Sequence, residues 1–246
     1  LPMMSRDISV QLSSVLKKKG VKILTSYKVK EIRADHSVVA DSLKGEIAVD
    51  ADAVIIAIGR KCNLKEIGLE NANVNFDRFV KVDDNMRTSV ENIFACGDIV
   101  GRAQLAHFAS ASAQVAVDSM LGEKASIDLS VVPSCVYTNP QIALVGKTEL
   151  EQGYKQGKFM MGANGKSLIQ GSNRGYVKVV ADENNVICGA EIFAINGTEI
   201  IGELALAVQK KMKVEEVAKV IHAHPTIMEA VGEAYEDIFG LATHKM

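Results

Sequence analysis

The sequence predicts an α/β portion followed by a separate α+β domain with an antiparallel sheet. The α/β portion is predicted by an amphipathic helical pattern at residues 5–19 and by a continuous apolar run, Ala53–Ile58, typical of a buried parallel strand. The α+β domain is predicted by the strand patterns Tyr176–Ala181 and Val186–Phe193, which helical patterns follow. The 246 residues are 48% hydrophobic and 24% charged, which is a globular composition.

The first 60 residues have the pattern of the second half of a nucleotide-binding α/β unit. The helix of residues 5–19 ends at Gly20, and we expect a strand directly after it at Val21–Leu24. Alternating apolar and polar residues then predict a small antiparallel meander with strands at Tyr27–Ile32, Ser37–Ala40 and Glu46–Val49.

The buried run Ala53–Ile58 ends in Gly59 and Arg60. A glycine after a buried strand permits close approach of a dinucleotide, and an arginine suits its phosphate or ribose. Many α/β crossovers end in the same way, so this pair alone is a weak signal.

A second segment, residues 61–131, combines short strands with one long helix. Strands are expected at Val80–Val82 and Ile93–Cys96, and an alanine-rich helix at Ala103–Leu121, ended by a glycine. Small residues on a helix face allow close approach to a neighbouring segment or ligand.

Gly97 and Asp98 follow the second of these strands, at the edge of a sheet where α/β folds bind ligands. The carboxylate suits polyol hydroxyls, and the N–H groups near Leu105, Ala106 and His107 at the helix N-terminus stabilise negative charge, such as that of a reduced flavin. An ordinary strand–turn–helix with a capping aspartate remains the alternative.

Residues 132–246 form the α+β domain. A strand is expected at Ser134–Tyr137, and Asp182–Asn185 has the composition of a hairpin turn between the two later strands. Two or three helices are expected after the hairpin, at Glu199–Lys211, at the short segment Val214–Val220 and at Thr226–Phe239.

The segment before the last helix carries the strongest chemical signal, His222-Ala223-His224-Pro225-Thr226 with Glu229 close behind. Pro225 suits the first position of a helix, which leaves His224 on its non-helical entry. Glu229 can then reach back to one imidazole nitrogen, which leaves the other free to accept a proton. The alternative is a surface histidine that happens to precede a helix.

Charge and composition exclude several classes of partner. A net charge of −2 gives no electrostatic reason to expect nucleic acid or an acidic membrane surface, and no apolar run is long enough to span a bilayer. The first residues lack a signal-peptide pattern and open directly into a helix, so we expect further chain upstream. The four scattered cysteines form neither a CxxC pair nor a metal-binding spacing, which fits a reducing cytoplasm.

Taken in order, these segments resemble the pyridine nucleotide-disulfide oxidoreductase family over essentially the whole chain. The resemblance rests on motifs that are modest singly and specific together: Ala57-Ile58-Gly59-Arg60, Ile93–Ile99 with Gly97-Asp98, Pro133–Pro140, and His224-Pro225-Thr226 with Glu229. Within the family, Leu105-Ala106-His107 and the doubled histidine are most similar to the members that oxidise dihydrolipoamide.

The resemblance implies a partial flavoprotein with two dinucleotide-binding domains. Residues 1–60 would be the C-terminal part of the NAD-binding domain, 61–131 the C-terminal segment of the FAD-binding domain, and 132–246 the interface domain of an obligate homodimer. It also implies residue roles: His224 as the acid/base of a dithiol substrate, Glu229 as its orienting group, Gly97, Asp98 and Gln104 to His107 along FAD, and Gly59 and Val29 beside NAD.

The implied whole enzyme would oxidise dihydrolipoamide on the lipoyl domains of 2-oxoacid dehydrogenase or related complexes, passing electrons through a cysteine pair and FAD to NAD. The Gly-rich FAD and NAD turns and the CxxxxC pair do not occur in these 246 residues. We therefore expect this polypeptide alone neither to turn over substrate nor to hold FAD tightly. The alternatives are another reductase of the family, such as a glutathione-type enzyme, and an inactive dimerisation fragment.

Overall fold

The computed structural model describes residues 4–245, which divide into two compact units: residues 9–61, and residues 4–8 together with 62–245. The prediction that the N-terminal segment is no signal peptide concerns residues 1–3 in part, and these three lie outside the described residues. Within the described part of the chain, no helix combines the length and apolar character needed to cross a membrane.

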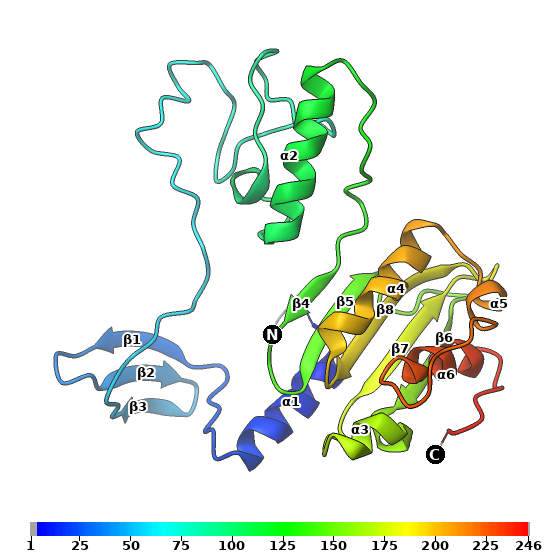
Figure 1. Ribbon diagram of the computed structural model, residues 1–246. Coiled ribbons are helices and arrows are strands. Elements are labelled where there is room, and N and C mark those ends of the chain that lie inside the picture. Colours follow the sequence, from blue (N-terminus) through cyan, green and yellow to red (C-terminus); the bar gives the residue numbers. More distant parts are fainter. Residues whose placement is uncertain (1–3, 246) are drawn as a thin grey trace. The chain divides into compact units, whose positions relative to one another are not determined.

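The smaller unit contains the predicted meander. Helix α1 (Arg6–Lys18) matches the predicted helix and continues into this unit, and it has lysines in its last turn. Strands β1 (Lys28–Ile32), β2 (Val38–Ser42) and β3 (Gly45–Val49) then form an antiparallel sheet in the order β1-β2-β3 (Figure 1). The register pairs Val38 with Val49, so the meander predicted from the alternating pattern is confirmed.

Two strands expected in this unit are absent from the described structure. Neither Val21–Leu24 nor Ala53–Ile58 is a strand, and the side chains of Ile55 and Ile58 are 90% and 95% exposed. A buried parallel strand requires hydrogen-bonded neighbours and covered faces. Among residues 9–61 the three meander strands pair only with one another, so the two apolar segments find no sheet to join.

Residues 62–131 are mostly loops packed around helix α2 (Ala106–Met120), after a short 3-10 helix, η1 (Gly97–Val100). The two strands expected here are reduced to isolated bridges, between Phe76 and Val80 and between Arg87 and Phe94. The loops bury a small core around Leu64, Val74 and Val80, and α2 contributes Val115 and Ala116 to a second core with Met86.

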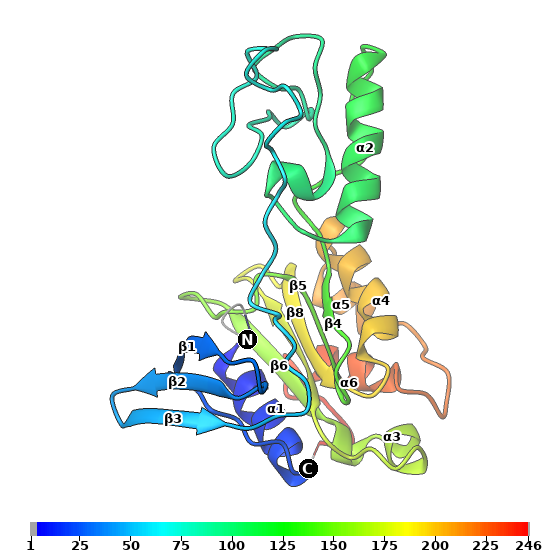
Figure 2. The same ribbon diagram turned by 90° about the vertical axis from the view of Figure 1, so that its left-hand side faces the viewer.

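Residues 132–245 contain a five-stranded antiparallel sheet in the order β4-β5-β8-β7-β6 (Figures 1 and 2). The strands are β4 (Ser134–Val136), β5 (Gln141–Gly146), β6 (Lys155–Met160), β7 (Tyr176–Ala181) and β8 (Ile187–Ala194). The strands β4, β7 and β8 and the hairpin turn between the last two were predicted and are confirmed.

The edge strand β6 was not predicted, because its sequence has only two apolar side chains and a central glycine. That glycine has a packing role: a Cβ on Gly157 would collide with the carbonyl oxygen of Ala234 in the helix above it. Glycine at this position therefore allows a helix backbone to lie directly on the strand.

Helices cover one face of this sheet. The covering helices are α4 (Gly197–Gln209) and α6 (Glu229–Asp237). The short α5 (Val214–Val217) contacts α6, and the short α3 (Gly165–Ile169) contacts a 3-10 turn, η2, at Met161–Ala163. Helix α4 packs over β5 and β8 and helix α6 over β6 and β7. Their apolar residues share one core with Val177, Val179 and Ile192 of the sheet.

The last helix begins later than expected. It starts at Glu229, whereas the sequence predicted Pro225 as its first residue. Residues 225–228 instead form an irregular turn that carries Ile227 into the core, where it is 5% exposed. Burial of this side chain sets the course of the turn and delays regular helix geometry by one helical turn.

Candidate acid–base site and cofactor-binding segments

His224 and Glu229 form a direct pair. The Nδ1 atom of His224 lies 2.8 Å from Oε1 of Glu229, and the side chains are 78% and 28% exposed. The other ring nitrogen, Nε2, has no hydrogen-bond partner among residues 4–245. An imidazole held at one nitrogen and open at the other is the geometry that proton transfer requires.

The carboxylate of Glu229 also organises the turn that carries the histidine. Its Oε2 atom accepts a hydrogen bond from the backbone N–H of Thr226 at 2.7 Å. The Thr226 hydroxyl donates to the carbonyl of Ala223 at 2.6 Å. The Thr-x-x-Glu spacing is that of a capping box. The sequence therefore carries a signal for the hydrogen bond between the Thr226 N–H and Glu229, besides the signal for the His224–Glu229 pair.

Asn164 holds the same turn from a distant part of the chain. Its side-chain amide donates to the carbonyl of Thr226 at 3.0 Å, and Asn164 is only 3% exposed. No local pattern connects these two residues, which lie 62 positions apart.

The hydrogen bonds to Glu229 affect its ionisation. Partial burial is the largest single influence and opposes ionisation, but the hydrogen bonds from the Thr226 N–H and the His224 ring outweigh it, so the pKa of Glu229 is lowered. The carboxylate is therefore ionised at neutral pH and can accept a hydrogen bond from the Nδ1–H group of His224.

The expected flavin-contacting residues all lie in the lobe formed by residues 62–131 around α2. Gly97 begins η1 with φ +76°, and its N–H donates to the buried Ser112 hydroxyl of α2 at 3.0 Å. A Cβ on Gly97 would lie 3.1 Å from the Cβ of Ala109, so the small residues of α2 do allow close approach. Asp98 follows, half-buried, and its carbonyl accepts from the Cys62 thiol at 3.2 Å.

The N-terminus of α2 lies in this same lobe. Leu105 occupies the position before the helix. Its side chain cannot accept a hydrogen bond, so it does not cap the first N–H groups of the helix. Gln104 and Leu105 are half-buried, and Ala106 and His107 are exposed. The His107 ring is engaged elsewhere, because its Nε2 lies 2.7 Å from the carbonyl oxygen of Pro133.

The expected NAD-contacting residues do not form a nucleotide site among residues 9–61. Gly59 is exposed in an unpaired segment with φ +145°, and no atom lies near the position of a Cβ. Val29 is in β1 opposite Ala40 and is 56% exposed. Without a parallel sheet, the strand–turn geometry that brings a backbone against a dinucleotide is missing there.

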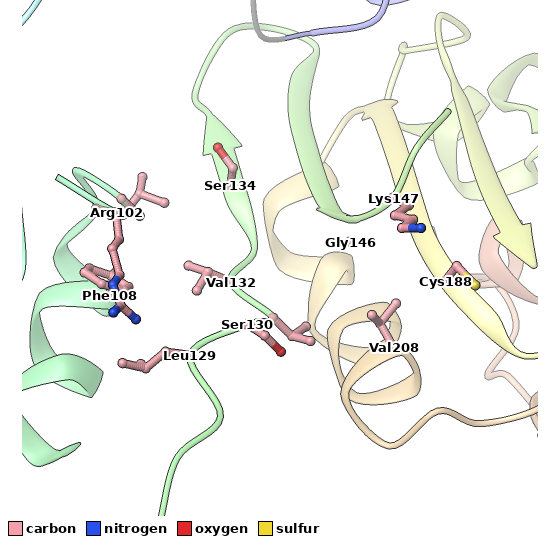
Figure 3. A pocket seen from close by; sticks show the side chains of 13 residues that line it. Arg102, Phe108, Leu129, Ser130, Val132, Ser134, Gly146, Lys147, Cys188 and Val208 are labelled. Atoms are coloured by element: carbon pink, nitrogen blue, oxygen red, sulfur yellow. The ribbon is translucent and has the colours of Figure 1, made fainter. Parts of the chain in front are cut away.

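A cavity of about 610 Å³ lies between the loops around α2 and the antiparallel sheet (Figure 3). Among the expected site residues only Leu105 lines it, beside Phe108, Lys147, Cys188 and Val208. Neither Asp98 nor His224 lines it, so we assign this cavity no part in the chemistry.

Two family models match the chain. The model described as pyridine nucleotide-disulphide oxidoreductase matches residues 1–113, and the dimerisation domain of the same family matches residues 132–235.

Curated relatives include the dihydrolipoyl dehydrogenase of Geobacillus stearothermophilus, which is 39% identical over 97% of this chain and 53% of the relative. The dihydrolipoyl dehydrogenase of Staphylococcus aureus is also 39% identical, over 94% of this chain and 52% of the relative. The chain spans about half the length of the curated relatives it matches.

Solved structures share the fold. LpdA from Mycobacterium tuberculosis superposes with a TM-score of 0.84 at 24% identity, covering 94% of this chain and 52% of that protein. The HOCl-induced flavoprotein disulfide reductase RclA from Escherichia coli superposes with a TM-score of 0.85 at 23% identity, covering 96% and 56%. With both family models and the relatives in agreement, the chain belongs to the pyridine nucleotide-disulphide oxidoreductase family.

Proposed function

We propose that this chain is the C-terminal portion of a dihydrolipoamide dehydrogenase, in which His224 is the proton-transfer group and Glu229 orients it. The observation that carries the proposal is the 2.8 Å contact between His224 Nδ1 and Glu229 Oε1 in a histidine whose side chain is 78% exposed. The identities of 39% to dihydrolipoyl dehydrogenases support lipoamide as the substrate.

In this proposal the ionised Glu229 keeps the proton of His224 on Nδ1, so that the Nε2 lone pair faces the substrate. Nε2 accepts a proton from one thiol of dihydrolipoamide, which leaves a thiolate, the form of sulfur that attacks a disulfide. The positive charge gained by the imidazole is balanced by the neighbouring carboxylate. The thiolate would attack the cysteine disulfide of the whole enzyme, forming a mixed disulfide and releasing one cysteine thiolate. The second substrate thiol would lose its proton and displace the other cysteine, which closes the lipoamide disulfide and leaves the cysteine pair reduced. His224 would then return its proton to solvent.

FAD and NAD would belong to the whole enzyme, where they carry electrons away from the thiol pair. We assign FAD to residues 61–131, with Gly97, Asp98 and Gln104 to His107 along it. The positive φ of Gly97 and the uncapped start of α2 suit a close polyol and a negative charge. NAD would border Gly59 and Val29 in residues 1–60, although these described residues alone do not fit a nucleotide.

Residues 132–246 would be the interface domain of a homodimer, in which His224 of one subunit completes the site of the other. The match of residues 132–235 to the dimerisation domain supports this assignment. Lipoyl domains of 2-oxoacid dehydrogenase or related complexes would be the partners, and the cytoplasm the compartment.

The test uses the full-length flavoprotein with His224→Gln. Loss of proton transfer lowers kcat roughly 100-fold or more while flavin content stays unchanged. The control is His36→Asn, because His36 lies exposed in the turn between β1 and β2 with φ +65°, which asparagine tolerates. A turnover rate of His224→Gln within a few fold of the wild type overturns the assignment.

Two alternatives are outcomes of related measurements. Activity of the wild-type protein with glutathione disulfide and none with dihydrolipoamide would make it a glutathione-type reductase. Light scattering and visible absorbance of the 246-residue chain test the second alternative, and a colourless dimer would favour a dimerisation module. The extensive core within residues 131–238 supports this alternative, because that part of the chain can pack by itself.

A further inference from the structure

The other histidine of the motif, His222, lies in contrasting surroundings. Its side chain is only 10% exposed, and its Nε2 atom lies 3.2 Å from Oε2 and 3.3 Å from Oε1 of Glu203 in α4. The ring therefore connects the segment before α6 to a helix that precedes it by about 20 positions.

A glycine in α6 makes room for the same ring. A Cβ on Gly232 would lie 2.8 Å from Nδ1 of His222 and 3.2 Å from its Cε1 atom, so any larger residue would displace the imidazole. Gly232 lies three positions after Glu229, on the same side of the helix. The His222 ring thus packs on α6 about one turn from the carboxylate that holds His224.

Apart from His222, the chain on the N-terminal side of His224 is held, among the described residues, by one side-chain hydrogen bond, which the Ala223 carbonyl accepts from the Thr226 hydroxyl. From residue 219 to residue 225 every residue is exposed except His222, and Ile221 is 97% exposed. On the C-terminal side the segment is secured by the buried Ile227 and by Asn164. An exposed histidine at a fixed distance from Glu229 needs anchors on both sides, because an unanchored backbone samples many conformations.

We propose that His222 is a positioning residue, held between Glu203 of α4 and Gly232 of α6, that keeps the His224 ring within reach of Glu229. It does not touch the substrate and transfers no proton in the reaction. Its effect on turnover rests on the proposed function, but its effect on His224 is a property of this chain alone.

The direct test is nitrogen NMR of the histidine rings in the 246-residue chain. In the wild type we expect His224 predominantly as the tautomer protonated on Nδ1. In His222→Ala and Glu203→Ala this preference is lost and the His224 signals move toward those of a free imidazole. Glu203→Gln retains an acceptor for the His222 ring and restores most of the preference.

Two further measurements protect the result from misinterpretation. His36→Asn leaves the His224 signals unchanged, and retained shift dispersion of β7 and β8 shows that each variant is folded. If His222→Ala does not fold, the comparison of Glu203→Ala with Glu203→Gln decides the outcome. Unchanged His224 tautomers in a folded Glu203→Ala or His222→Ala overturn the proposal.

Kinetics in the full-length flavoprotein separate this proposal from the assignment of function. Misplacement of a proton-transfer group should lower kcat of His222→Ala roughly 10- to 100-fold, with KM nearly unchanged and an altered pH profile. A wild-type enzyme that does not oxidise dihydrolipoamide refutes the proposed function but leaves the NMR result to decide the role of His222. Loss of the tautomer preference with unaltered kcat refutes the catalytic consequence.

Discussion

Glu229 Oε1 lies 2.8 Å from the Nδ1 atom of His224, although the two residues are separated by an irregular turn. The other oxygen of the carboxylate accepts the N–H of Thr226, so one side chain both begins helix α6 and orients the imidazole. Stability and the proposed proton transfer would therefore depend on the same residue, and substitutions can separate the two.

Replacement of Glu229 by alanine should lower the free energy of unfolding by about 1 kcal/mol, because the half-buried N–H of Thr226 loses its acceptor in the turn before α6. Glu229→Gln retains an acceptor oxygen and should lose less. Urea unfolding of the two variants measures the difference. Glu149→Ala, at an exposed glutamate, is the control. Equal losses for alanine and glutamine at position 229 would contradict the role of this hydrogen bond.

His244 should stabilise the fold in a pH-dependent way. Its Nδ1 lies 2.6 Å from Oε1 of Glu233, and this hydrogen bond, with the charges of Glu233, Glu229 and Glu236, raises the pKa of His244 above its ordinary 6.5. A raised folded-state pKa contributes stability that is fully present below the unfolded value and is lost as pH rises through the folded value.

The check compares wild type and His244→Gln by urea unfolding across this range. The wild type should be the more stable protein below about pH 6.5, and the difference should fade as pH rises beyond the folded-state pKa. A stability difference that grows toward alkaline pH would show that His244 is not paired with an acidic group.

Gly97→Ala should destabilise the lobe around α2 for two reasons: its φ of +76° is unfavourable for a side chain, and the new Cβ would lie 3.1 Å from that of Ala109. Gly122 has nearly the same φ, +74°, with no atom within 4 Å of a Cβ, so Gly122→Ala has the backbone cost alone. That cost is about 1–2 kcal/mol.

Thermal unfolding of both variants isolates the packing contribution. Gly97→Ala should have the lower Tm, since the contact with Ala109 adds to the backbone cost. Equal values of Tm would show that the loop adjusts and that Gly97 is needed only for its backbone conformation.

Two buried tyrosines should respond oppositely to loss of their hydroxyls. The Tyr235 hydroxyl is buried and makes no hydrogen bond of normal geometry among the described residues, and burial together with the neighbouring Glu203 carboxylate raises its pKa. Tyr235→Phe removes a desolvated polar group, so stability should stay the same or rise by up to about 1 kcal/mol.

Tyr176 is the matched control, because it is equally buried but donates to the carboxylate of Glu191, which also pairs with Lys178 at 3.2 Å. Tyr176→Phe should cost about 1–3 kcal/mol, since a buried charged acceptor loses its donor. Urea unfolding measures both variants. A loss above about 1 kcal/mol for Tyr235→Phe would mean that its hydroxyl binds Glu203 in solution.

Local pattern was sufficient wherever the contacts are local. The meander, the β7–β8 hairpin and α1, α2 and α4 follow from alternation, helical spacing and turn residues, with ends displaced by a few positions at most. The pairing of His224 with Glu229 also follows from the sequence, because five residues of chain keep the two groups within reach.

Tertiary structure decided what depends on distant segments. Burial of Ile227 delays the start of α6, and Gly157 in the edge strand β6 leaves room for the backbone of α6. Asn164 and Glu203 bind residues on either side of His224 from distant positions in the chain. The run Ala53–Ile58 shows the converse, since an apolar segment becomes a strand only when neighbouring strands offer it hydrogen bonds. Residue order encodes short-range geometry directly, whereas long-range contacts exist only after the whole core has assembled.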